Sequence, residues 1–209
     1  MSCIKLFHGD VPSDIRWPKV VAIDTETTGL DIIKDRLCLV QIGDGRGNAI
    51  LVQLKKNPHC PNLKKMLTDP KIQKLFHYAR FDVAIMRKYL KIDSIKNIFC
   101  TKIASRFART YTDSHSLKNL VSELLHIELK KEQQCSYWGA DELTDAQKGY
   151  AANDVLYLHK LKEKLTDMLK KSKRYEIALK FMNFVDNICT ADMMGFEEDL
   201  FRCRDDKNK

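Results

Sequence analysis

A short apolar run that ends in two acids constrains this chain more than any other feature. Residues 20–23 read as the start of a buried central strand, and Asp24 and Glu26 follow directly. Because side chains alternate along a strand, both acids point to the same side, roughly 6–7 Å apart. Carboxylates this close repel each other unless protons or cations neutralise them. The pair indicates a divalent metal site, and the alternative is a strand that runs out into a solvated turn.

Strand signals dominate the first part of the chain and helical signals the second. Strand-like runs are expected at residues 20–26, 37–43 and 49–54, with shorter candidates at 4–7, 74–77 and 97–101. The glycine-rich stretch 43–47 predicts a hairpin turn between the runs on either side of it. Apolar periodicity predicts helices at 80–91 and 116–126, one helix from 144 to about 165, and another at about 172–188. This order predicts an α/β domain around a mixed sheet.

Two of the predicted helices carry further acids that are candidates for the same site. Asp82 lies on or beside the apolar face of its helix, where an unpaired carboxylate is costly. Tyr150 and Asp154 are four residues apart, so they project from one side of a helix that a capping box opens at Thr144. Taken singly, Tyr150 is an ordinary core tyrosine and Asp154 an ordinary surface acid. Their combination with the acid pair indicates a shared site.

The charge of the chain narrows the class of partner. The formal net charge is +8 and the pI is about 9.0, as in proteins with an anionic partner such as nucleic acid and also in merely soluble proteins with solvated lysines. A basic chain whose best motif is a group of acids suits an enzyme that attracts a polyanion towards metals held by carboxylates. No apolar run approaches the length of a membrane helix, and residues 1–15 lack a signal-peptide core, so no membrane partner is expected. The seven cysteines are scattered and form no Cys-x-x-Cys pair. A reducing, cytoplasmic location fits best.

Together these residues resemble the three motifs of the DEDD superfamily of 3′-5′ exonucleases, and more closely the ribonuclease D family. The matching segments are 23–27, 77–82 and 150–155, supported by 37–43, Trp138 and 143–147. Tyrosine at 150 marks the DEDDy subclass, because the sister subclass carries histidine where this chain has Gly149. The resemblance covers about residues 4–165. It implies a ribonuclease H-like mixed β-sheet flanked by α-helices.

The resemblance also implies a domain organisation. Residues 1–190 would form a stand-alone 3′-5′ exonuclease domain, and 191–209 a charged C-terminal tail that is partly disordered. About forty residues follow the helix of the third motif, too few for the helical nucleic-acid-binding domains of larger bacterial ribonuclease D proteins.

The implied activity is metal-dependent hydrolysis of phosphodiester bonds from the 3′ end of RNA, releasing nucleoside 5′-monophosphates. Two Mg²⁺ or Mn²⁺ ions would be held by Asp24, Glu26, Asp82 and Asp154, since oxygen ligands favour these ions over zinc. Asp24 would bridge both ions. Glu26 and Asp154 would complete the ion that activates water, and Asp82 would support the other. Tyr150 would orient the attacking water, as a phenol of pKa about 10 is a weak general base.

The implied substrate is a single-stranded 3′ end, with RNA favoured. The backbone at Thr27 and the side chain of Leu30 would meet the terminal nucleotide. His77 would reach its sugar or phosphate, and the alternative is a packed histidine at a strand end. Basic residues that are candidates for a strand channel are Arg80, Lys102, Arg106, Arg109 and Lys118.

Three other functions stay open at this point. A DNA 3′-5′ exonuclease would use the same site, because the chemistry need not touch the 2′-hydroxyl. A non-catalytic nucleic-acid-binding domain is disfavoured, since a pure binder gains nothing from buried acids that face a polyanion. A scaffold protein would need an exposed apolar stripe along residues 175–188.

Overall fold

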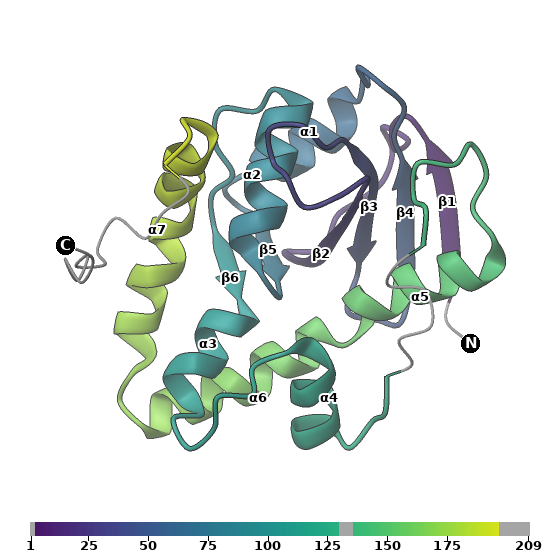
Figure 1. The fold of residues 1–209 in the computed structure, drawn as a ribbon. Helices are drawn as coiled ribbons and strands as arrows, with labels where there is room; N and C mark the ends of the chain where they lie inside the picture. The colour runs from purple at the N-terminus through teal and green to yellow at the C-terminus, as the bar shows by residue number, and fades with distance from the viewer. Residues whose placement is uncertain (1–2, 130–135, 197–209) are drawn as a thin grey trace, which may run out of the picture.

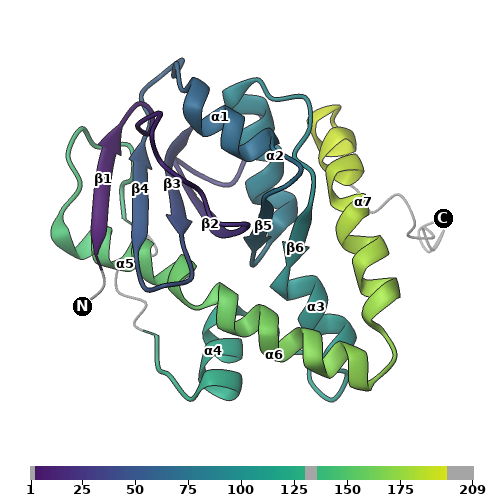
Figure 2. The same cartoon turned by 180° about the vertical axis from the view of Figure 1, so that it is seen from behind.

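The computed structural model describes residues 3–129 and 136–196, which build a mixed sheet with helices on both faces (Figures 1 and 2). The strands are β1 (Ile4–His8), β2 (Val20–Thr27), β3 (Leu37–Gly43), β4 (Ala49–Gln53), β5 (Gln73–Phe76) and β6 (Ile98–Cys100). The helices are α1 (Pro61–Thr68), α2 (Ala79–Leu90), α3 (Thr101–Ala108), α4 (Leu117–Leu125), α5 (Asp145–Leu156), α6 (Leu158–Lys171) and α7 (Tyr175–Met193). The predicted α/β class is confirmed.

The strands lie in the order β1-β4-β3-β2-β5-β6. The pairs β2–β3 and β3–β4 are antiparallel, so the hairpin predicted at 43–47 is confirmed, and Gly45 and Gly47 in its turn both have positive φ angles. The strands β5 and β6 run parallel to β2, and β1 runs parallel to β4. Because β2 and β5 are parallel, their carboxyl ends lie at the same edge of the sheet. That edge positions the candidate site.

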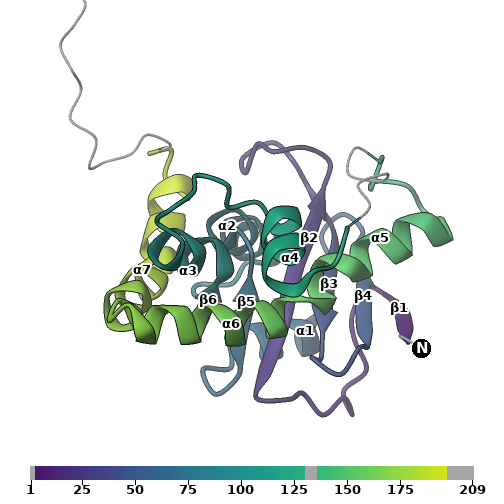
Figure 3. The same ribbon diagram turned by 90° about the horizontal axis from the view of Figure 1, so that it is seen from below.

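The helix expected from residue 144 to about 165 is two helices, so the prediction of one continuous helix is wrong. α5 ends at Leu156 and α6 begins at Leu158, with Tyr157 between them at φ −98° and ψ −12°. No glycine or proline marks this break. The reason is tertiary: α5 packs on β2, β3 and β4, whereas α6 packs against α3 and α4. Figures 1 and 3 show the two helices end to end along one side of the sheet.

The short helices α1 and α3 are absent from the sequence-based expectations. Each spans only eight residues, too few for a clear helical period, and each buries one face in the core: Leu63, Met66 and Leu67 in α1, and Ala104 in α3. Packing on the sheet therefore defines them more than their local sequence does.

The last helix, α7, is joined to α2 by two ion pairs. Arg87 lies 3.2 Å from the buried Asp186, which also binds Lys96 at 2.9 Å. At the end of α7, Asp192 binds Arg80 at 2.6 Å. These contacts make α7 part of the domain core along the β6 side of the sheet (Figure 2).

The expected domain boundary at residue 190 lies inside α7, and most of the expected tail, residues 197–209, lies outside the described residues. The apolar stripe that a scaffold function would need is present in part, since Ile177, Phe181 and Phe184 are exposed. None of the described helices is both long and apolar enough to cross a membrane.

Candidate active site

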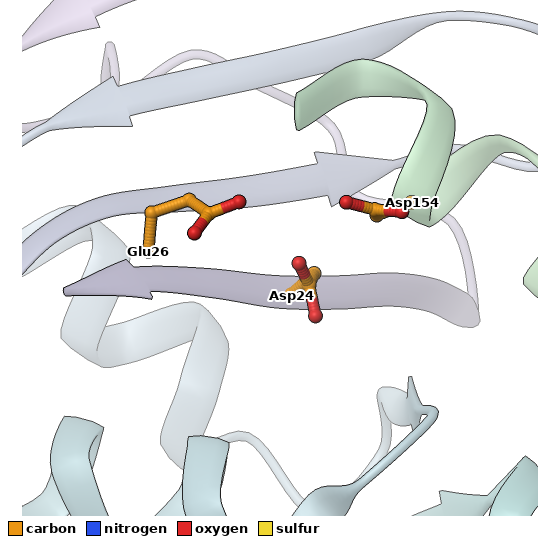
Figure 4. Close-up of side chains that lie close together, drawn as sticks. All are labelled: Asp24, Glu26 and Asp154. Atoms are coloured by element: carbon orange, nitrogen blue, oxygen red, sulfur yellow. The ribbon is translucent and has the colours of Figure 1, made fainter. Parts of the chain in front are cut away.

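Three of the four predicted acids meet beside the centre of the sheet. Asp24 and Glu26 extend from β2, and Asp154 reaches them from α5 (Figure 4). One carboxylate oxygen from each lies within 4.8 Å of the others, the only such acid, histidine or cysteine group in the described part of the chain. Each side chain is half-buried. Oxygen donors at this spacing fit a hard divalent cation.

The strand β2 brings Asp24 and Glu26 together for the reason that the sequence suggests. Residues Val21–Ile23 are buried, and the alternation of side chains then turns both acids to the α5 side. Asp24 lies opposite Gln41, and Glu26 lies opposite Leu39 on β3. A register shift directly after Glu26 ends the regular pairing there.

The helix α5 presents Tyr150 and Asp154 together. It begins with the predicted capping box, in which the hydroxyl of Thr144 and the side chain of Gln147 each bind the other residue's backbone N–H. The ring of Tyr150 packs against that of Trp138, with 6.1 Å between the two ring centroids, and Trp138 is itself buried. This contact fixes the phenol on the site side of the helix.

The fourth acid, Asp82, lies next to the group of three. It is buried on α2 and accepts a hydrogen bond of 2.6 Å from the hydroxyl of Thr25. Thr25 stands between the two acids of β2 and points to the other face of the strand. Asp82 was predicted from the sequence, but Thr25 was not. Only the packing of α2 on this face of β2 makes Thr25 and Asp82 partners.

The acids hold protons more tightly than free carboxylates do. Burial raises the pKa of Asp24 to about 7, that of Asp154 to about 8 and that of Glu26 to about 10, and repulsion between the acids adds to the shifts of Asp154 and Glu26. Burial and the charge of Asp24 also raise the pKa of Asp82. A bound cation would stabilise the ionised form of these acids and replace their protons.

The phenol of Tyr150 stays neutral at pH 7. Burial, and then the charge of Asp154, raise its pKa well above the usual range, and its hydroxyl donates to the Asp154 carboxylate. A neutral phenol in this position can orient a polar group but is not a general base.

The loop after β2 places Leu30 in solvent. The hydroxyl of Thr27 donates to the carbonyl of Gly29, and that of Thr28 donates to Asp35 at 2.9 Å. A Cβ atom on Gly29 would lie 2.4 Å from the Asp35 carboxylate, so a side chain there would displace Asp35 from its hydrogen bonds to Thr28 and Asp31. Leu30 is 85% exposed.

A pocket of about 620 Å³ lies beside this loop, at the carboxyl ends of β2 and β5. Its walls include Leu30, Tyr78 and Phe81, together with the ion pair of Arg80 and Asp192. Apolar and aromatic walls with one partly exposed guanidinium suit a nucleotide base and its phosphate.

His77 follows β5 and contacts Thr101, with 2.9 Å between Nδ1 and the hydroxyl oxygen. Burial, and then the charge of Lys102, lower its pKa to about 4, so the imidazole is neutral at pH 7. The contact with Thr101 is that of a packed histidine at a strand end. A role of His77 toward a substrate stays a prediction.

The prediction that Arg109 is a candidate for the strand channel is wrong. This side chain is fully buried, where it binds Glu123 and the carbonyl of Ser114. By contrast, the ammonium group of Lys102 lies 4.2 Å from the centre of the partly exposed Tyr78 ring, on the side of the pocket.

The resemblance found in the sequence is confirmed by comparison with known proteins. A model of the 3′-5′ exonuclease family matches residues 10–170, which is most of the chain. The chain belongs to this family. Its ribonuclease H-like architecture is shared with solved nucleases.

Curated relatives of this exonuclease domain are longer proteins. DNA polymerase I of Aquifex aeolicus is 35% identical over 196 residues, which cover 85% of this chain and 32% of the polymerase. Ribonuclease D of Granulibacter bethesdensis is 32% identical over 161 residues, which cover 77% of this chain and 40% of that protein. The chain thus spans about a third to two fifths of their length.

Solved structures include relatives of matching length. The structure of Brucella melitensis NrnC bound to pGG is 42% identical with a TM-score of 0.89, covering 97% of this exonuclease domain and 99% of that chain. Escherichia coli RNase D, described as an exoribonuclease, is 25% identical with a TM-score of 0.71, covering 82% and 45% respectively.

The raised pKa values predict how the stability of the metal-free domain depends on pH. Unfolded acids ionise near pH 4, whereas Asp24, Asp154 and Glu26 ionise at about 7, 8 and 10 in the fold, so the folded state binds more protons. The melting temperature should therefore fall as pH rises through this window. The double variant Asp24→Asn, Asp154→Asn should show a flatter profile in a thermal melt.

The same experiment locates the cation. Mn²⁺ should raise the melting temperature of the wild type, and more so at high pH, because it binds deprotonated acids. A rise of equal size in the double variant would place the ion elsewhere.

Proposed function

We propose that this protein is a metal-dependent 3′-5′ exonuclease that acts on RNA and releases nucleoside 5′-monophosphates. The observation that carries the proposal is the convergence of Asp24, Glu26 and Asp154 within 4.8 Å, with Asp82 and Tyr150 beside them. A binding module would have no use for acids that repel both one another and a nucleic acid.

In this proposal two Mg²⁺ or Mn²⁺ ions would be held by the four acids, with Asp24 between the two positions. When bound, such ions lower the pKa of water and stabilise the departing 3′-oxygen. Asp24 and Asp154 would hold the ions as carboxylates, because a bound cation favours the charged form of each acid. Thr25 keeps Asp82 turned toward the site through its 2.6 Å hydrogen bond.

Tyr150 supplies orientation in the same scheme. Its hydroxyl donates to Asp154, so its oxygen lone pairs remain free to accept a hydrogen bond from the attacking water. The packing of its ring on Trp138 holds that oxygen in place.

The substrate end would lie in the pocket beside the loop after β2. The backbone at Thr27 and the exposed side chain of Leu30 would contact the terminal nucleotide, with His77 near its sugar. The pocket with Leu30 and Tyr78 would take a base, and Arg80 a phosphate. The pGG bound to the NrnC of Brucella supports a substrate as short as two nucleotides, because that protein matches this chain along almost its whole length.

DNA is the second candidate substrate. The 35% identity to a DNA polymerase I over 85% of this chain favours it, whereas the ribonuclease D relatives favour RNA. Hydrolysis at phosphorus needs no 2′-hydroxyl, so the acids alone are compatible with both.

A product analysis tests the proposal and separates the two substrates. Labelled single-stranded RNA and DNA of equal sequence, together with pGG, are incubated with Mn²⁺, with Mg²⁺, or with a chelator. We expect shortening from the 3′ end, release of 5′-monophosphates, faster turnover of RNA and no reaction with the chelator. Products that carry 3′-phosphates, or hydrolysis that persists with the chelator, would contradict the proposal.

The Tyr150→Phe variant should be slower than the wild type, by less than a variant that loses an acid of the site. It lacks the hydroxyl that orients water but keeps the ring that packs on Trp138 and all four carboxylates. The measurement is single-turnover hydrolysis at saturating Mn²⁺. A loss as large as that of Asp24→Asn would mean that Tyr150 does more than orient water.

A further inference from the structure

Gln41 lies in the middle of β3 with no exposed surface, directly opposite Asp24 on β2. Opposite residues on paired strands share a face, so its amide extends to the same side of the sheet as the Asp24 carboxylate. Neither the nitrogen nor the oxygen of this amide has a hydrogen-bond partner among the described residues. An unpartnered amide is a rare and costly feature of a protein interior.

Gln41 is covered by the part of α5 that carries Asp154. Leu39 and Gly43, the residues on either side of Gln41 on the same face of β3, both contact this helix. Leu39 packs in one cluster with Ala151, and a Cβ atom on Gly43 would lie 3.2 Å from that of Val155. The amide of Gln41 therefore faces the turn of α5 between these contacts, where Asp154 points toward Asp24 (Figure 4).

An apolar side chain of the same volume would be more stable in this place, because it would bury no unpaired polar atoms. A hydrogen-bond donor in this place can serve the carboxylate of Asp24, which lies directly opposite. Carboxylates that hold a metal are commonly fixed by a hydrogen bond to the oxygen turned away from it.

We infer that Gln41 is a positioning residue for the acid pair, and that its amide N–H donates to the Asp24 or Asp154 carboxylate when these acids hold a divalent cation. This inference rests on the proposed function, since it requires a cation at these acids. Gln41 touches neither substrate nor cation in this arrangement; it fixes the direction of the carboxylate that does.

Gln41→Met tests the inference, because methionine keeps the volume and removes the donor. The melting temperature of metal-free Gln41→Met should equal or exceed that of the wild type. Its affinity for Mn²⁺, measured by isothermal titration calorimetry, should fall by about 10- to 100-fold.

Gln53→Met is the matched control. Gln53 is also buried and lies on β4 opposite Leu39, so it shares the sheet face of Gln41. Unlike that of Gln41, its amide donates hydrogen bonds to the carbonyls of Ala140 and Asp141, at 2.8 and 3.2 Å. This variant should lower the melting temperature and leave Mn²⁺ affinity within about twofold of the wild type.

Two results would overturn the inference. Failure of Gln41→Met to fold, or a lower melting temperature without metal, would show that the amide stabilises the fold by itself. Unchanged Mn²⁺ affinity would show that it does not support the acids. Absence of Mn²⁺ binding in the wild type is a different outcome, because it would overturn the proposed function as well.

Discussion

The Asp24→Asn variant should fold like the wild type and hydrolyse a single-stranded 3′ end at least about 100- to 1000-fold more slowly, the usual cost of losing one major electrostatic stabiliser. Asparagine has the shape of aspartate but cannot take a negative charge. The charge of Asp24 acts on each of the other three acids, since it raises the pKa of Glu26, Asp82 and Asp154. Its loss should therefore affect both proposed metal positions.

Single-turnover rates with saturating Mn²⁺ measure this effect, and a thermal melt shows that the variant is folded. The metal-free melting temperature should not fall, because the substitution removes repulsion between buried acids. Asp145→Asn is the control, since that acid is fully exposed at the start of α5 and should leave turnover unchanged. Near-normal turnover in Asp24→Asn would exclude the bridging role.

The Asp186→Ala variant should lose about 3–5 kcal/mol of stability, which corresponds to a fall of roughly 10 °C in melting temperature for a chain of this size. Asp186 is buried on α7, where it accepts hydrogen bonds from the Ser94 hydroxyl, the backbone N–H of Ile95 and the ammonium group of Lys96. Its removal leaves the buried guanidinium of Arg87 without its ion pair.

Denaturant and thermal unfolding measure the loss. Lys148→Ala is the control, because it breaks an exposed pair with Asp145, the kind of pair that contributes at most about 1 kcal/mol. An equally small effect of both substitutions would mean that α7 is not held to the domain by Asp186.

Patterns within a few residues carried the prediction of the site. The apolar run before Asp24 and Glu26 has a strand period, and strand geometry turns both acids to one side whatever the rest of the chain does. Tyr150 and Asp154 share a helix face for a similar reason, and the capping box gave the start of α5. The glycine-rich hairpin between β3 and β4 is a third signal of this local kind.

Contacts between distant residues were decided by the tertiary structure. Thr25 and Asp82 are 57 residues apart, and Arg80 and Asp192 are 112 apart, so no periodicity links them. Arg109 resembles a surface arginine in the sequence, yet Glu123 on the neighbouring helix makes its burial possible.

The break at Tyr157 and the burial of Gln41 have the same origin. No glycine or proline stands at residues 155–159 to end a helix at residue 156, and α5 and α6 separate because α5 packs on β2, β3 and β4 whereas α6 packs mainly against α3 and α4. A glutamine in a strand can face water or the core with equal ease, and it is the position of α5 over β3 that puts Gln41 beside the acids. The sequence alone thus determined which residues are candidates for the site and which local faces they share, because the shared faces follow from backbone geometry. Which faces meet was determined only by how the helices pack on the sheet.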